Sequence, residues 1–189
     1  MKRGLLVILS GPSGVGKGTV RQWFMDDPEL NLTFSISMTT RPKREGEEEG
    51  KDYFFVDRET FEKAIEDGLL LEYTEFVGNY YGTPAKEVED LREQGKNVLL
   101  EIEVEGASQV MAKVPDAVSI FIVPPTMEEL EVRIRGRRSE PEEIIQQRLA
   151  KAGREMEALS LYRYTVCNDD AQLAAKLIKT ILLDAMEKN

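Results

Sequence analysis

Two patterns of apolar and polar residues alternate along the chain. The first is a short, nearly continuous apolar run, found at residues 5–9, 98–102 and 118–123. A run of this length is typical of a strand buried on both faces of a parallel sheet. Residues 32–36 and 164–167 are further predicted strands. The second pattern is an amphipathic stretch of helical period between these runs. Together the two patterns predict an α/β fold with a central parallel sheet flanked by helices.

Capping and turn residues mark where several predicted helices begin and end. Asp57 is expected to cap a helix that Gly68 ends, and Pro84 to begin one that Gly95 ends. An amphipathic helix is predicted from Ala171 to the end of the chain. These boundaries fix the lengths of the helices that cover the sheet.

The segment from about residue 34 to residue 84 departs from the alternation of strands and helices. It contains consecutive extended pieces and a polar loop over residues 39–51. This organisation predicts a subdomain inserted into the α/β core.

Composition excludes several function classes. The 189 residues carry a formal net charge of −10, which argues against a nucleic-acid partner. The absence of histidine excludes Ser-His-Asp hydrolysis and zinc-protease motifs. No apolar stretch approaches the ~20 residues of a membrane span, and we expect no signal peptide. The single cysteine, Cys167, excludes an internal disulfide and is expected to be a buried strand thiol in a cytoplasmic protein.

The residues after the first strand form a phosphate-loop motif. The pattern G-x-x-x-x-G-K lies between a predicted strand and a predicted helix, the context that separates a phosphate loop from a chance match. Its glycines let backbone N–H groups point at phosphate oxygens, and its lysine adds a positive charge. The alternative is a glycine turn that binds nothing. The residues predicted to bind ATP are Gly11, Pro12, Ser13, Gly14, Val15, Gly16, Lys17, Gly18 and Thr19.

The residue after the motif lysine is Gly18, where most phosphate loops have Ser or Thr to help hold Mg²⁺. The sequence G-K-G-T at this place resembles the nucleoside-monophosphate kinases. The resemblance implies that Mg²⁺, the cofactor expected with ATP, is held mainly by nucleotide oxygens and water.

Motifs beyond the phosphate loop extend the resemblance to nearly the whole chain. They are S-x-T-T-R-x-x-R at residues 37–44, G-K-D-Y at 50–53, G-N-Y-Y-G-T at 78–83 and V-C-N-D at 166–169. In this order they resemble the guanylate kinases, which phosphorylate GMP from ATP. The resemblance implies a phosphate-loop kinase with a GMP-binding subdomain and a short helical lid. The expected division is a core of about residues 1–33, 84–130 and 155–189, a GMP-binding subdomain of about 34–83 and a lid of about 131–154.

The resemblance also assigns residues to the GMP phosphate. Arg41 and Arg44, with the hydroxyl groups of Tyr53 and Tyr81, are expected to hold it. Arginine forks match phosphate geometry, and phenols add hydrogen bonds without charge. The alternatives are solvated loop arginines and tyrosines of the core or of an edge strand.

The guanine base is assigned in the same way. Glu72 is expected to accept from N1–H and the 2-amino group, both of which adenine lacks, and Ser37 and Thr83 to bond the base edge. Glu103 stands where many family members have aspartate, and its longer side chain is expected to shift its contact with guanine. Glu101 is a weaker candidate for contact with Mg²⁺ through water.

The implied catalytic residues are all cations: Lys17, Arg41, Arg44, Arg137 and Arg148, the last two from the lid. Arg133 is a candidate partner of the lid arginines, and Asn168 is expected to contact the adenine of ATP. Because the attacking group is a phosphate oxygen, no general base is required, which agrees with the absence of histidine.

Two alternatives to ATP:GMP phosphotransfer remain at this stage. One is a guanylate-kinase-like module that binds phosphorylated peptides, and the other is a related kinase with a different small phosphorylated acceptor. An intact phosphate loop favours an enzyme over a binding module. The expected partners are ATP and GMP, with no nucleic acid and no membrane, and the sequence leaves the oligomeric state open.

Overall fold

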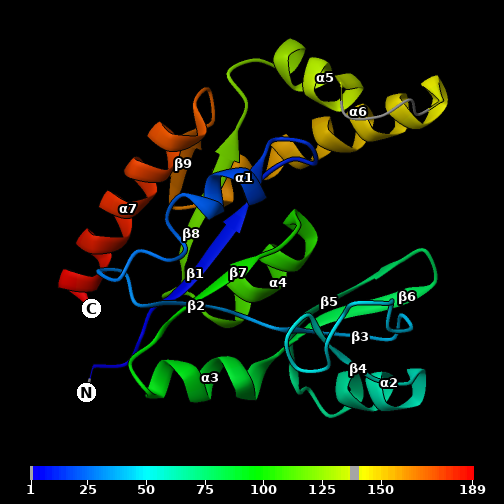
Figure 1. Ribbon diagram of the computed structural model, residues 1–189, viewed down its shortest axis with the longest axis vertical. Helices are drawn as coiled ribbons and strands as arrows, with labels where there is room; N and C mark the ends of the chain where they lie inside the picture. Colours follow the sequence, from blue (N-terminus) through cyan, green and yellow to red (C-terminus); the bar gives the residue numbers. More distant parts are fainter. Residues whose placement is uncertain (1, 137–140) are drawn as a thin grey trace.

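The computed structural model describes residues 2–136 and 141–189. Its central sheet has five parallel strands in the order β2-β7-β1-β8-β9 (Figure 1). This confirms the predicted parallel α/β sheet. The strands are β1 (Leu6–Ser10), β2 (Leu32–Phe34), β7 (Asn97–Glu101), β8 (Val118–Val123) and β9 (Tyr164–Cys167).

Burial on both faces explains why the strand sequences are continuous apolar runs. In β1, Val7 and Leu9 pack into one apolar cluster, and Leu6 and Ile8 pack into a second. Side chains of α1 and α7 join the first cluster, and side chains of α3 and α4 join the second. These helices are α1 (Lys17–Gln22), α3 (Ala85–Glu93), α4 (Val104–Lys113) and α7 (Ala171–Lys188).

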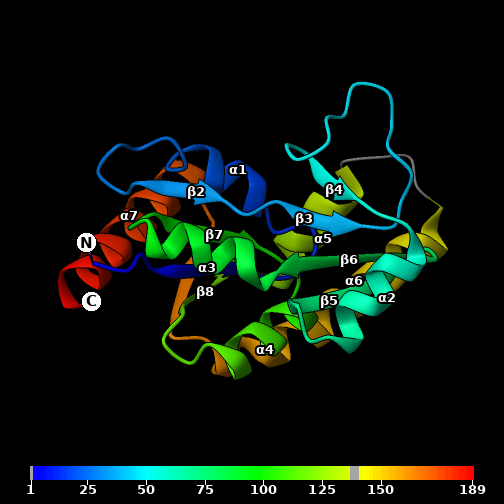
Figure 2. The ribbon, with the colours of Figure 1, turned by 90° about the horizontal axis from the view of Figure 1, so that it is seen from below.

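The inserted segment forms a second sheet beside the core (Figure 2). Its strand order is β4-β3-β6-β5, with β6 antiparallel to both of its neighbours. Asp57 accepts a hydrogen bond from Thr60 N–H at 2.7 Å, which confirms it as the cap of the following helix. The elements are β3 (Ser37–Thr39), β4 (Tyr53–Phe55), α2 (Arg58–Glu66), β5 (Leu70–Phe76) and β6 (Asn79–Pro84).

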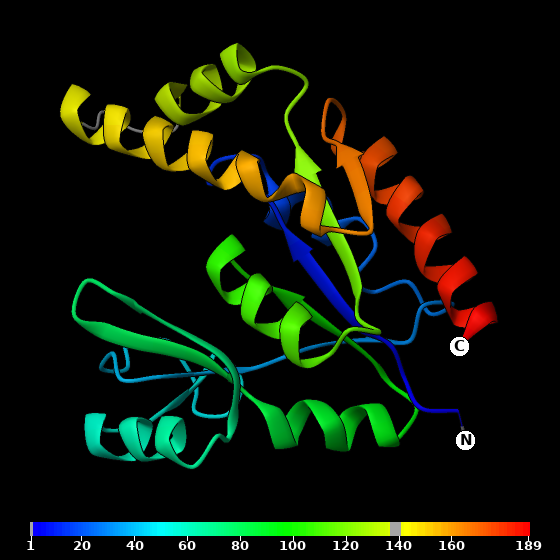
Figure 3. The ribbon, with the colours of Figure 1, turned by 180° about the vertical axis from the view of Figure 1, so that it is seen from behind.

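Two helices lie over the end of the core at which β1 points into the phosphate loop (Figure 3). They are α5 (Met127–Gly136) and α6 (Glu142–Met156), and a 3₁₀ helix (Glu157–Leu161) leads from α6 toward β9. Leu130 and Ile134 of α5 and Ile145 of α6 are buried in the first apolar cluster. α5 and α6 therefore rest on the core through apolar contacts.

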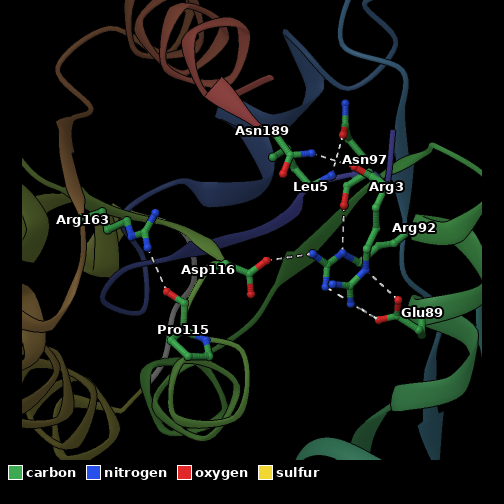
Figure 4. A network of polar contacts seen from close by, with 10 residues as sticks. Arg3, Leu5, Glu89, Arg92, Asn97, Pro115, Asp116, Arg163 and Asn189 are labelled. Carbon is green, nitrogen blue, oxygen red and sulfur yellow. Dashed lines mark hydrogen bonds and ion pairs between the residues drawn. The ribbon is translucent and has the colours of Figure 1, made fainter. Parts of the chain in front are cut away.

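A polar network holds the opposite end of the sheet together (Figure 4). Arg92 is 3% exposed, and its guanidinium donates to the Gly4 carbonyl at 2.9 Å and to Asp116 at 3.2 Å. Asn189 donates to the carbonyl of Arg3, so the two ends of the chain lie side by side. This network is remote from the phosphate loop.

One expectation about the core is wrong. Cys167 is exposed rather than buried. β9 is an edge strand, so its side chains alternate between the core and solvent, and Val166 takes the buried position instead. Within residues 2–136 and 141–189, no helix combines the length and apolar character needed to cross a membrane.

Candidate active site

The phosphate loop follows β1 directly and depends on glycine at defined positions. Gly14 and Gly16 have φ angles of +86° and +95°, a region that side chains with a Cβ rarely adopt. A Cβ on Gly11 would stand 2.5 Å from the carbonyl oxygen of Ile122 in β8. Alanine is therefore excluded at Gly11 by close approach to the sheet, and disfavoured at the other two by backbone strain.

Lys17 begins α1 and folds back over the loop. Its ammonium group donates to the Gly11 carbonyl at 2.9 Å. Burial lowers the pKa of Lys17, and the charges of Glu155, Glu101 and Glu103 oppose that shift. The lysine thus lies in a partly desolvated site surrounded by carboxylates.

Side chains from two distant segments fix the loop from opposite sides. Asn168, in the turn after β9, donates through Nδ2 to the Val15 carbonyl at 2.8 Å. Arg133 of α5 donates to the Asn168 carbonyl at 2.9 Å. On the other side, the Ser13 N–H donates to Oε2 of Glu155 in α6 at 3.0 Å. The Asn168 amide, which was assigned to the adenine of ATP, is thereby anchored to the loop itself.

The side chains assigned to the GMP phosphate come from β4, β6 and the loop after β3. The guanidinium of Arg41 lies 5.4 Å from the ring centroid of Tyr53, and the Tyr53 and Tyr81 rings are 6.1 Å apart. Arg41 makes two hydrogen bonds to the carboxylate of Glu47, at 2.6 and 3.1 Å, and the Arg44 N–H donates to the same carboxylate. The structure therefore brings Arg41, Tyr53 and Tyr81 together, while the Arg44 side chain is exposed in the adjoining loop.

The predicted base-recognition carboxylate is buried. Glu72 of β5 is 5% exposed and accepts from the Thr83 hydroxyl at 2.6 Å. Burial raises its pKa, with the Thr83 hydrogen bond and the charge of Lys113 acting in the opposite direction. Gly106 of α4 leaves room for this carboxylate, because a Cβ there would stand 2.5 Å from Oε2. Glu72 and Thr83 thus form one preorganised polar pair.

A cavity of about 680 Å³ lies between the inserted sheet, the end of β7 and α6. That volume is in the range of small-molecule sites. Its subdomain wall includes Ser37, Tyr53, Glu72 and Tyr81, four of the residues assigned to GMP. Its core and lid wall is lined by Glu101, Glu103, Lys151, Arg154 and Glu155. Two of these lie beside the phosphate loop, since Glu155 bonds Ser13 and Oε1 of Glu101 is 3.6 Å from the Cβ position of Gly18.

The carboxylates at the end of β7 have different partners. Glu101 forms an ion pair with Arg21 of α1 at 2.5 Å. Glu103 accepts from Lys151 of α6 at 2.7 Å, across the cavity. Burial lowers the pKa of Lys151, but the hydrogen bond and charge of Glu103, with the charge of Glu155, raise it overall. Glu103, assigned to guanine, is therefore held by a lysine of α6.

The described part of the chain contains no group of three or more Asp, Glu, His or Cys side chains arranged to hold a metal ion. One carboxylate beside nucleotide phosphates is nevertheless a donor set that suits Mg²⁺. Glu101 fits this role by position, because its Oε1 faces the residue after Lys17.

Both the sequence and the fold have known counterparts. The guanylate kinase family model matches residues 3–185. The chain belongs to the guanylate kinase family. Guanylate kinase of Enterococcus faecalis (strain ATCC 700802 / V583) is 54% identical over 96% of this chain and 89% of its own length. Guanylate kinase of Streptococcus thermophilus (strain CNRZ 1066) is 52% identical over 96% and 87%. The crystal structure of guanylate kinase from Anaplasma phagocytophilum has a TM-score of 0.71 and 37% identity, over 97% of this chain and 86% of that chain.

The structure describes two of the three arginines expected in the lid. Arg137 lies outside the described residues. Arg148 lies in α6, partly buried, in the same helix as Lys151 and Glu155. Arg133 links α5 to the phosphate loop through Asn168.

Three residues of the candidate site were not singled out from the sequence: Glu47, Lys151 and Glu155. Glu47 belongs to a run of charged loop residues, and the other two lie on a helix rich in charge. Carboxylates and lysines in such settings usually form a solvated face. Only the spacing of Lys151 and Glu155, one helical turn apart, indicated that they share a side of α6.

Proposed function

We propose that the chain transfers the γ-phosphoryl group of ATP to GMP and releases ADP and GDP. The observation that carries this proposal is the cavity of about 680 Å³ that is lined both by Glu72 and by the carboxylates beside the phosphate loop. Membership of the guanylate kinase family supports it. A donor nucleotide on the loop and an acceptor in the subdomain would meet in that space.

Glu72 supplies the selectivity for guanine. Its carboxylate would accept from guanine N1–H and the 2-amino group, while Ser37 and Thr83 bond the base edge. Adenine lacks both donors and would leave a buried carboxylate unpaired. Sites of this kind discriminate by ~10⁴ or more. The buried setting of Glu72 supports this role, because the cost of an unpaired charge is largest where water is excluded.

The GMP phosphate is assigned to Arg41, Arg44, Tyr53 and Tyr81. An oxygen of that phosphate attacks the γ-phosphorus, the bond from the γ-phosphorus to the β,γ-bridging oxygen breaks, and the electron pair leaves on ADP. A phosphate monoester has its second pKa near ~6, so the nucleophile is already ionised at neutral pH.

Catalysis is then positioning and charge stabilisation. We assign the donor phosphates to the backbone of residues 11–19 and to Lys17, and the moving phosphoryl group to Lys17, Arg137 and Arg148. When bound with ATP, Mg²⁺ neutralises charge on the β- and γ-phosphates. Nucleotide oxygens and water would hold it, with Glu101 as the candidate for contact through water. We assign residues 34–83 to the acceptor subdomain and residues 131–154 to the lid. We also propose that the protein works in the cytoplasm.

An ADP-release assay with GMP, AMP, CMP and UMP as acceptors tests the proposal. ATP-dependent activity with GMP alone is the expected result. ADP release at the same rate without any acceptor would contradict it.

The peptide-binding alternative has less support. The phosphate loop keeps Lys17 and the glycines with positive φ that such a loop needs. A phosphopeptide module would bind its ligand at Arg41 without turnover, so GMP-dependent ADP release separates the two functions.

A further inference from the structure

A buried carboxylate that the proposed reaction does not use lies against the phosphate loop. Glu155, at the end of α6, is 8% exposed. Its Oε2 accepts from the Ser13 N–H at 3.0 Å, a contact between residues 142 positions apart. The lid helix is thereby attached directly to the donor loop.

The other oxygen of Glu155 lies on the side of Lys151 and Glu103, the latter assigned to GMP. Oε1 is 3.8 Å from Lys151 Nζ, one turn earlier in α6, and Lys151 in turn donates to Glu103 at the end of β7. The four groups form a continuous polar chain from the Ser13 amide to Glu103. All three side chains in it line the cavity.

A carboxylate at this place is unfavourable for ATP binding by charge alone. It lies beside a loop whose purpose is to hold a triphosphate, and like charges repel strongly where water is scarce. Its charge favours the protonated form of Lys17, and its hydrogen bond to the loop adds a geometric benefit. A charge-assisted hydrogen bond to a loop amide fixes the backbone there, as Asn168 fixes it at Val15 on the other side.

We propose that Glu155 is a positioning residue for the donor site. It holds the Ser13 end of the phosphate loop in the geometry that Lys17 and the loop amides need, and it makes no contact with GMP. This inference rests on the proposed ATP:GMP transfer. It adds a residue of the lid helix to the groups that shape the ATP site.

Two substitutions separate the hydrogen bond from the charge. Glu155→Ala removes the acceptor for the Ser13 N–H, whereas Glu155→Gln keeps an acceptor oxygen and removes the charge. Losing a hydrogen bond to a charged group lowers an equilibrium constant by roughly 10- to 100-fold. We expect Glu155→Ala to lower kcat/KM for ATP by about that factor, with the Kd of GMP measured by calorimetry unchanged. Glu155→Gln should stay within about threefold of the unsubstituted protein.

Glu157→Ala is the matched control, because Glu157 is an exposed glutamate two residues further along. It should leave both substrates unaffected. A folded Glu155→Ala protein with normal ATP kinetics would overturn the inference, as would equal losses for ATP and GMP. A Glu155→Gln protein as impaired as Glu155→Ala would also overturn it. Failure of the unsubstituted protein to phosphorylate GMP would contradict the proposed function. Normal turnover in both the unsubstituted protein and Glu155→Ala would contradict only the role given to Glu155.

Discussion

Gly106 is the most informative position for testing how GMP is recognised. It lies in the first turn of α4, where glycine is normally unfavourable and alanine would add up to ~1 kcal/mol of helix stability. Its presence is explained by the Glu72 carboxylate, which lies against it. Gly106→Ala is therefore expected to damage GMP recognition although it improves helix propensity.

The structure sets the size of the effect. A Cβ at residue 106 would stand 2.5 Å from Oε2 of Glu72, whereas ordinary contact begins at 3.4 Å, so the carboxylate must retreat by about 0.9 Å. Its other oxygen is held by the Thr83 hydroxyl at 2.6 Å, so that hydrogen bond must shift or break. Misplacement of a recognition group by ~1 Å costs up to 10²-fold. We expect kcat/KM for GMP to fall by about 10- to 100-fold, with KM for ATP unchanged.

The assay is ADP release with GMP varied at saturating ATP, together with the melting temperature of each protein. Gly153→Ala is the matched control, since Gly153 is also helical and a Cβ there would meet nothing within 4 Å. It should keep normal GMP kinetics and melt slightly higher. If Gly106→Ala matches Gly153→Ala within twofold in kcat/KM for GMP, the contact with Glu72 does not govern recognition.

Three further predictions concern single residues. Glu72→Gln should sharply weaken use of GMP with ATP binding nearly intact. Because burial raises the pKa of Glu72, its ionised form costs stability at neutral pH, so Glu72→Gln should also melt higher at pH 7.5. That gain should vanish as the pH falls below the unfolded value of ~4.3, where both states are protonated; a gain independent of pH would contradict the assignment. Lys17→Met should abolish turnover but spare GMP binding by calorimetry, and equal loss of both would count against it. Arg92→Met should destabilise the fold by about 1–3 kcal/mol in chemical denaturation and leave both KM values unchanged.

The sheet could be predicted because its strands are buried on both faces, which produces unbroken apolar runs such as residues 118–123. The subdomain could not be resolved to the same degree. β3 is three residues long with the sequence Ser-Met-Thr, and its pairing with β6 depends on residues more than 40 positions away. Neither length nor composition identifies such a strand before its partner is known.

The same limit applies to the site. Glycines and a lysine at fixed spacing identify a phosphate loop because phosphate geometry requires them. Glu47 and Glu155 carry no comparable signal, since a glutamate on a loop or helix looks the same whether it faces solvent or a guanidinium. Cys167 is the opposite case. Its strand sequence predicted a buried thiol but did not reveal that β9 lies at an edge of the sheet, where Cys167 is exposed.

The two anion-binding regions share a physical arrangement that the motifs alone do not suggest. In each, a carboxylate of the chain holds a group assigned to phosphate: Glu47 binds Arg41, and Glu155 binds the Ser13 amide. Such pairing offsets the cost of gathering like charges and keeps each donor in a defined orientation. The consequences differ with exposure. The side chain of Glu47 is 20% exposed and lies in the loop between β3 and β4, so a dianionic phosphate can compete with it for the Arg41 guanidinium. Glu155 is 8% exposed and lies on a helix, which is why we assign Glu47 to exchange with the acceptor phosphate and Glu155 to fix the donor loop.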